Sequence, residues 1–191
     1  VTMQPIDVDQ RYNFLNPRLG ISYIHHRHNL FASVAVAHRE PTRSDFTDRY
    51  MFSADDSYPK PERLIDFEVG YTYIAPRLSL GINLYYMLYH NQLVATGMVN
   101  DGDDALNTNV DKSYRRGVEL MASWRVAKWF TLSANATFSQ NKIKDYVDEL
   151  KDSPTYGENL GDKSISYSPS VVGSLIADFH IGGFSALWHT Q

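Results

Sequence analysis

Hydrophobic and polar residues alternate with a period of two along most of this chain. The longest run covers residues 78–89, and shorter runs cover residues 65–73, 117–125 and 130–139. Successive side chains of a β-strand point to opposite faces, so this period predicts strands with one apolar and one polar face. Runs of nine to twelve residues are long, because strands of soluble proteins average about five or six residues.

The pattern predicts an all-β fold, an antiparallel β-meander of about eight long strands. Short links at residues 74–77 and 181–183 alternate with long polar links at residues 40–61, 91–112 and 143–168. Outer-membrane β-barrels sort their connections in this way, with tight turns on one rim and long loops on the other. The expected strands are residues 16–24, 29–39, 62–73, 78–90, 113–126, 130–142, 169–180 and 184–190.

Two observations indicate that the apolar face meets lipid rather than a protein core. The opposite face carries mainly Ser, Thr, Asn and Gly, whereas a water-exposed exterior carries Lys and Glu in number. Aromatic residues of the apolar face lie beside the short links, which suits the headgroup level of a membrane. These aromatic residues are Tyr23, Tyr71, Tyr73, Trp124, Phe130, Phe179 and Phe184. A soluble barrel or sandwich with the apolar face inside is the alternative.

Composition excludes several kinds of partner and site. The net charge of -4 gives no reason to expect a nucleic-acid partner. The chain has no cysteine, which excludes disulfides and thiolate metal sites. No apolar run approaches the roughly 18 residues that a membrane-spanning helix needs. The chain opens at Val1 without a basic and apolar leader, so we expect a processed chain or a piece of a longer one.

Several motifs carry a resemblance to a known family. One strand ends in Arg39-Glu40-Pro41, and after a long link Pro61-Glu62 opens a strand that contains Glu68-Val69-Gly70-Tyr71. The runs Asn83–Met87 and Tyr114–Leu120 add to the pattern. Together these motifs resemble the C-terminal barrel of TonB-dependent receptors, especially those of Bacteroidetes-type bacteria.

The resemblance implies part of a 22-stranded transmembrane β-barrel in the cell outer membrane of a Gram-negative bacterium. Such a receptor imports a scarce solute, and an iron–siderophore or similar chelate is favoured over cobalamin or an oligosaccharide. The implied partners are outer-membrane lipid, the protein's own N-terminal plug domain, the TonB complex reached through that plug, and the small-molecule ligand. We expect residues 1–191 to be a partial barrel without plug or last strand, with no cofactor and no enzyme activity.

Charged residues on the polar face are the first candidate site. They would face the lumen and contact the plug or a passing solute, although an interior ladder of ion pairs is the favoured interpretation. These lumen-facing residues are Arg18, Arg39, Asp66, Glu68, Glu119 and Arg125.

The first long link is the second candidate, as an extracellular ligand loop, because loops on a rigid scaffold often hold binding residues. Its candidate residues are Arg43, Tyr50, Phe52 and Tyr58. Capping and solvation of the loop is the alternative role for these side chains.

Three weaker motifs favour structural roles. His25-His26-Arg27-His28 could hold a metal but falls in a short turn without a carboxylate, so we predict a solvated basic turn. Asn100–Asp104 resembles a calcium loop but lacks the spaced oxygens and closing glutamate of an EF-hand. His38, His90 and Asp45 fall near the loop rim, where a hydrolase site could lie.

Besides the rim hydrolase, two further function classes stay open at this stage. One is a self-contained eight-stranded outer-membrane barrel with a structural or adhesive role, which pairing of the first strand with the eighth would support. The other is a soluble β-barrel that binds an apolar ligand.

Overall fold

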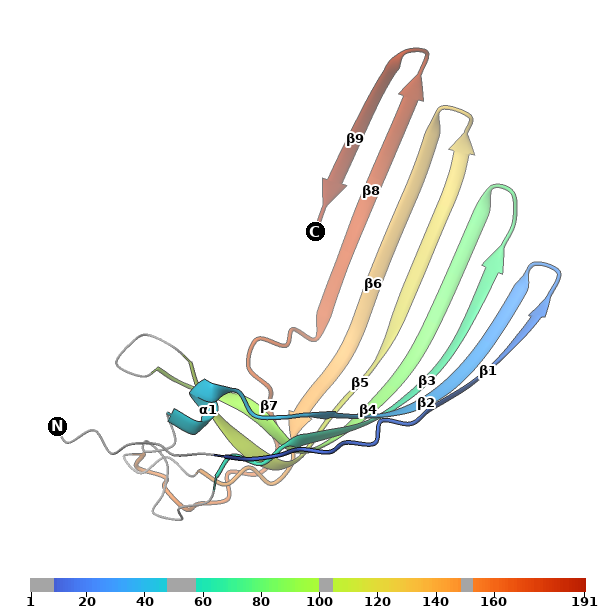
Figure 1. Ribbon diagram of the computed structural model, residues 1–191. Coiled ribbons are helices and arrows are strands. Elements are labelled where there is room, and N and C mark those ends of the chain that lie inside the picture. Colours follow the sequence, from blue (N-terminus) through green and yellow to red (C-terminus); the bar gives the residue numbers. More distant parts are fainter. Residues whose placement is uncertain (1–8, 48–57, 100–104, 149–152) are drawn as a thin grey trace.

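The sequence folds into a single curved antiparallel sheet with one short helix (Figure 1). The computed structural model describes residues 9–47, 58–99, 105–148 and 153–191. The elements are β1 (Arg18–His25), β2 (His28–Arg39), α1 (Arg43–Thr47), β3 (Glu62–Ile74), β4 (Leu78–Val99), β5 (Ala105–Ala127), β6 (Phe130–Ile143), β7 (Lys163–Ser164), β8 (Val171–Ile181) and β9 (Phe184–Thr190).

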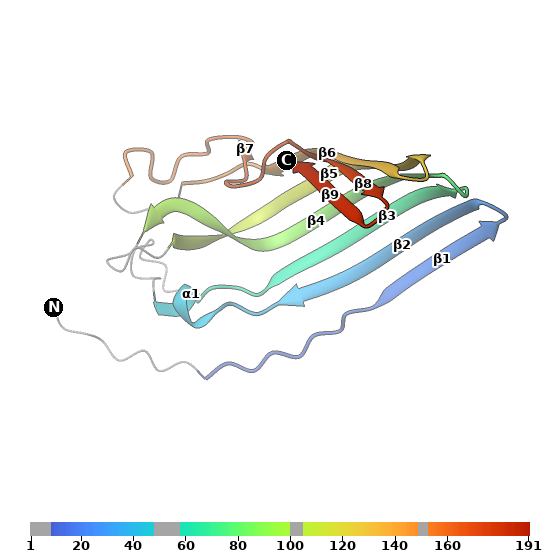
Figure 2. The same ribbon diagram turned by 90° about the horizontal axis from the view of Figure 1, so that it is seen from above.

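Each long strand pairs with the next long strand along the chain, in the order β1-β2-β3-β4-β5-β6-β8-β9, and the two-residue β7 pairs with β6. The predicted all-β antiparallel meander is therefore confirmed. Figure 2 shows β1 and β9 at separate margins of the sheet. Within the described ranges these two strands do not pair, so the sheet does not close into the small eight-stranded barrel.

The connections are sorted between the two ends of the sheet, as the spacing predicts. Tight turns join β1 to β2, β3 to β4, β5 to β6 and β8 to β9 at one end (Figure 1). Helix α1, β7 and the described parts of the long links lie at the other end, which we call the loop end. Among the described residues, no helix is long and apolar enough to cross a membrane.

The second of the predicted long links is wrong in its bounds. Residues 91–112 are mostly strand, because β4 continues to Val99 and β5 begins at Ala105. After Asn91, whose φ is +52°, the pairing resumes with Gln92 opposite Val110. The extension is stabilised by a small core at the loop end, in which Val94, Val110, Ile143 and Ile165 are buried.

The strand register separates an apolar face from a polar face across the sheet. One continuous cross-strand row on the apolar face joins Ile21, Ala32, Val69, Leu84, Val118, Phe138 and Val171. Leu80 is 42% exposed and Leu84 is 47% exposed. These side chains do not converge on a sealed core, which a soluble barrel requires.

Aromatic rings lie beside the tight turns on this apolar face. The rings of Phe130 and Phe179 stack with centroids 4.6 Å apart, and the Trp129 centroid lies 5.8 Å from that of Phe130. At the β1–β2 turn, the His28 imidazole is hydrogen-bonded to the Tyr71 hydroxyl at 2.7 Å. Such rings suit a membrane interface, because their apolar bodies face lipid while polar tips reach water.

Candidate functional site on the polar wall and its loop end

We call the curved sheet the wall. Its polar face carries all six predicted lumen-facing charges. Arg18 shares a cross-strand row with Ala35 and Asp66, and Glu119 lies opposite Asn83 on the same face. The Asn83 side-chain amide donates a hydrogen bond to Glu119 at 3.2 Å. The six charges are spread over the wall rather than joined in one ladder, since only Arg39 forms an ion pair among them in the described structure.

Glu62, which sequence reasoning passed over, is the best-connected carboxylate of the wall. It is 8% exposed and begins β3. Its Oε2 lies 2.7 Å from Nε of Arg39, and its Oε1 accepts hydrogen bonds from Nη2 of Arg39 at 3.0 Å and from the amide of Leu93 at 2.6 Å. One side chain therefore joins β2, β3 and the extended part of β4.

The middle of the wall holds polar atoms without a partner in the described part of the chain. Buried Oδ1 atoms of Asp66 and Asn83, and Nε of Arg115, have no hydrogen bond there, and Oδ1 of Asn29 is a fourth case. All four residues lie on the polar face by register. Because buried polar atoms are normally hydrogen-bonded, this wall is suited to contact water or another polar surface.

Arg115 and Tyr89 also belong to this wall although neither was among the predicted site residues. The guanidinium of Arg115 lies 5.7 Å from the centroid of the Tyr89 ring. Arg115 lies opposite Met87, which lies opposite Asp66. Arg115 could have been found from the alternation of the strand. It lies four residues before Glu119 on the same strand, an even number, and therefore shares its face.

Two aromatic side chains of the polar face lie over glycines of neighbouring strands. A Cβ at Gly70 would overlap the ring of Phe31, and a Cβ at Gly117 would lie 2.6 Å from the Tyr85 hydroxyl oxygen. Glycine is required at both positions because the rings, and at Gly117 also the Phe138 carbonyl oxygen at 2.6 Å, occupy the space of a side chain. The wall therefore presents ring faces as well as charges.

The loop end is a packed platform rather than a set of separate loops. The Asn109 side chain accepts a hydrogen bond from the Lys60 amide at 2.8 Å and donates to the Lys60 carbonyl at 3.0 Å. Asp45 of α1 accepts from the Thr42 amide at 2.7 Å and from the Asn107 side chain at 3.1 Å. These bonds tie the link between β2 and β3 to the extended β4–β5 hairpin.

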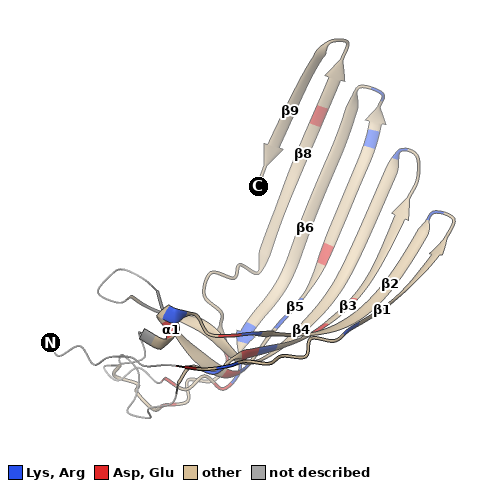
Figure 3. Cartoon of the chain, in the orientation of Figure 1, with Lys and Arg blue, Asp and Glu red and all other residues tan. Residues whose placement is uncertain are grey.

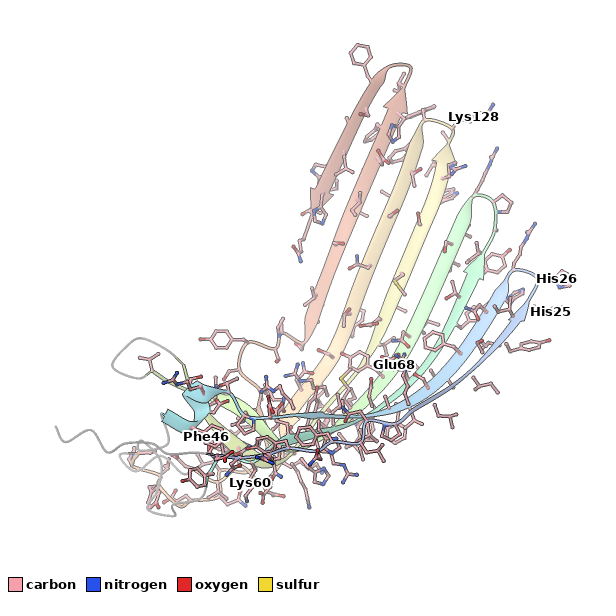
Figure 4. The ribbon with its side chains drawn as sticks, viewed as in Figure 1. His25, His26, Phe46, Lys60, Glu68 and Lys128 are labelled. Atoms are coloured by element: carbon pink, nitrogen blue, oxygen red, sulfur yellow. The ribbon has the colours of Figure 1, made fainter. Side chains whose placement is uncertain are left out.

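The predicted ligand loop is only partly described. Arg43 is exposed at the first residue of α1, and Tyr58 is exposed with its ring centroid 5.9 Å from that of Phe46. Figure 4 shows Phe46 and Lys60 at the loop end. Tyr50 and Phe52 lie outside the described residues, so their part in a ligand surface stays a prediction.

The histidine turn projects from the opposite end of the sheet, as does Lys128 (Figure 4). Nε2 of His25 lies 2.8 Å from Nδ1 of His26, whereas His28 bonds Tyr71, so the three imidazoles do not converge. Among the described residues, no cluster of three or more His, Cys, Asp or Glu could hold a metal. Asn100–Asp104 lie outside the described residues.

The three residues proposed for a rim hydrolase are placed apart. His38 hydrogen-bonds Asn16 at 2.9 Å, whereas Asp45 belongs to the loop platform. His38 and His90 lie on the apolar side of the wall, each opposite Arg63. In the described part of the chain, no hydrogen bond joins any two of the three residues, so they form no catalytic relay.

Comparison with known proteins decides the family. The family model described as "TonB dependent receptor-like, beta-barrel" matches residues 2–190. This chain belongs to that family. The family assignment made from the sequence motifs is thus confirmed, whereas the Bacteroidetes subgroup stays a prediction. Members of this receptor family act in transport rather than catalysis. No curated protein sequence matches the chain.

Solved receptor structures share the fold of this TonB-dependent receptor chain. The copper transporter OprC matches with a TM-score of 0.67 and 17% identity, over 90% of this chain and 24% of that chain. The siderophore receptor PirA from Pseudomonas aeruginosa matches with a TM-score of 0.62 and 14% identity, over 91% and 32%. The FrpB iron transporter from Neisseria meningitidis (F3-3 variant) matches with a TM-score of 0.59 and 19% identity, over 91% and 26%. The chain therefore spans about a quarter to a third of these receptors.

Proposed function

We propose that this chain is one section of the wall of an outer-membrane receptor that imports a scarce solute. The two-faced wall carries the proposal. Its apolar face leaves Leu84 and Phe138 about half exposed, which is favourable only against lipid over so wide an area. Its polar face carries charges, ring faces and unpartnered polar atoms, which suit a wet lumen. Residues 1–191 are then a partial barrel, to which a plug and further strands are added.

The plug domain is the proposed partner of the polar wall. Asp66, Asn83 and Arg115 each have a buried polar atom without a hydrogen bond in the described chain, and a polar plug surface could supply the missing partners. The TonB complex would act on the receptor through that plug. Neutralising Asp66 to asparagine should weaken plug docking more than ligand affinity, and a ligand affinity that fell as much as docking would refute this assignment.

An iron–siderophore or similar chelate is the proposed solute, with cobalamin and oligosaccharide as alternatives. The names of the similar structures support a metal-linked solute, because they are a copper transporter, an iron transporter and a siderophore receptor. The loop platform is the proposed outer ligand surface, with Arg43 and Tyr58 as its described candidates. Its packing holds these residues on a fixed base, which lowers the entropy lost on binding.

Uptake measurements test the proposal. Cells that lack the gene for the receptor are compared with cells that express it, with and without an active TonB complex. The radiolabelled solutes are iron chelates of several chemical classes, cobalamin and an oligosaccharide. We expect TonB-dependent uptake of at least one iron chelate. Uptake of cobalamin or an oligosaccharide alone would overturn the chelate assignment. Equal uptake of every solute by cells with and without the receptor would overturn import itself.

A further inference from the structure

One cross-strand row on the apolar face is basic from end to end. His38 lies opposite Arg63, Arg63 opposite His90, and His90 opposite Lys112. The amide of Lys144 continues the row by donating a hydrogen bond to the Lys112 carbonyl at 2.9 Å. We call these five residues the basic row.

The basic row lies at the edge of the apolar band. On β4, the outward positions from Leu78 to Leu88 are all aliphatic or aromatic, and they span roughly 33 Å along the strand at about 3.3 Å per residue. With a strand tilt near 40°, this corresponds to a height of about 25 Å, the height of the apolar band of an outer-membrane barrel. His90 is the next outward residue, so at β4 the basic row reaches the level of the lipid headgroups.

No acidic side chain neutralises the row in the described part of the chain. Arg63, Lys112 and Lys144 are exposed, and none of them forms an ion pair there. The adjacent Asp145 forms no ion pair with Lys144 either. The next two outward rows toward the middle of the sheet carry no Asp or Glu.

Two more cations from those rows strengthen the positive field. Arg116 and Lys142 occupy outward positions beside Tyr114. The Arg116 guanidinium and the Lys144 ammonium lie 5.5 Å and 6.0 Å from the centroid of the Tyr114 ring. The Tyr114 ring thus lies against two cations at the edge of the apolar band, and Nε of Arg116 is fixed by a hydrogen bond of 2.9 Å to Gln140.

The opposite end of the sheet is built differently. Its cations Arg27, Arg77 and Lys128 lie in separate hairpin turns, beyond the ends of the strands (Figures 3 and 4). Isolated turn cations are expected of any solvated rim. A continuous row that faces outward along four strands and the residue after β6 is not explained by solvation alone.

We propose that the basic row binds the phosphate groups of a lipid headgroup in the outer leaflet. This rests on the proposed placement of the chain in the outer membrane with the loop end outside. Anionic headgroups attract clustered Lys and Arg at a membrane surface, and Arg binds phosphate oxygens with paired donors. The spacing of the cations along the row suits a headgroup with more than one phosphate.

The test uses the full receptor that contains this chain, purified in detergent and supplied with lipopolysaccharide from the host strain. The variant combines Arg63→Gln, Lys112→Gln and Lys144→Gln. We expect the lipopolysaccharide retained per receptor to fall by about tenfold or more, because each cation contributes to the attraction. A second variant that keeps the charges, with Arg63→Lys, Lys112→Arg and Lys144→Arg, should retain most of the lipid.

A matched control removes the same charge from the other end, with Arg27→Gln, Arg77→Gln and Lys128→Gln, and should retain lipid like the parent. Phosphatase-treated lipopolysaccharide should bind weakly to the parent. Three results would each overturn the proposal. The first is equal lipid retention by the charge-removing variant of the basic row and by the control variant. The others are equal binding of treated and untreated lipopolysaccharide to the parent, and displacement of the lipid by inorganic phosphate at equal concentration. Solute uptake is measured in parallel. If the charge-removing variant loses lipid but takes up solute normally, the result supports the lipid site. If no solute is taken up although lipid binding still depends on the basic row, only the import function is refuted.

Discussion

Replacing Glu62 by alanine removes the acceptor that joins three strands at the loop end. The magnitude follows from its contacts. The Leu93 amide, in a residue that is 8% exposed, loses its 2.6 Å bond, and an unsatisfied buried donor costs about 1–3 kcal/mol. The Arg39 side chain is 59% exposed, so its ion pair contributes no more than about 1 kcal/mol. We expect the free energy of unfolding to fall by about 1–4 kcal/mol in total.

Urea unfolding of the receptor in lipid vesicles, followed by tryptophan fluorescence, measures this loss. Glu62→Gln keeps an oxygen for the Leu93 amide and should lose only about 1 kcal/mol. Glu68→Ala is the matched control, because Glu68 lies on the same face of β3 and its carboxylate has no hydrogen bond in the described chain. Equal destabilisation by Glu62→Ala and Glu68→Ala, or by Glu62→Gln and Glu62→Ala, would refute the reasoning.

Three further predictions follow from the wall and the platform. Leu84→Arg should cost about 2–4 kcal/mol in the same unfolding assay, because it places a charge in lipid, whereas Asn135→Arg on the exposed polar face should cost about 1 kcal/mol or less; equal costs would contradict the assignment of the faces. Gly70→Val should lower the free energy of unfolding by about 1–3 kcal/mol through overlap with the Phe31 ring, and Phe31→Ala in the same chain should restore part of it. Asp45→Ala should speed proteolysis of the link between β2 and β3 several-fold, because α1 loses its bonds to the platform, and an unchanged cleavage rate would show that those bonds do not hold it.

The fold could be predicted from the sequence because a barrel wall is encoded locally. Alternation from Leu78 to Leu88 fixes both the strand and its two faces, and the short links fix which strands pair. The bounds of β4 and β5 could not be predicted in this way. Beyond Asn91 the polar residues are pairing partners, and only the contacts of Val94 and Val110 with residues from the next link, such as Ile165, show that the hairpin continues.

The sequence predicts which face of the sheet the charged residues occupy, but not which residues they pair with. The alternation of side chains along each strand places Arg39, Asp66 and Glu119 on the polar face of the wall. Which charges pair depends on the register between strands, and the Glu62 carboxylate meets the Leu93 amide only because β4 is extended. The basic row escaped the sequence pattern for the same reason, since Arg63, His90 and Lys112 come from three strands and meet only across the sheet.

The faces of the wall are tested most directly by spin-label scanning of residues 78–89 in the membrane-embedded receptor. The chain has no cysteine of its own, so single cysteines can be introduced and labelled once any in the rest of the receptor are replaced. We predict that oxygen, which concentrates in lipid, reaches labels at Leu80, Ile82, Leu84 and the other even positions, while a water-soluble nickel chelate reaches labels at odd positions such as Asn83. Equal accessibility at even and odd positions, or the reverse pattern, would contradict the account.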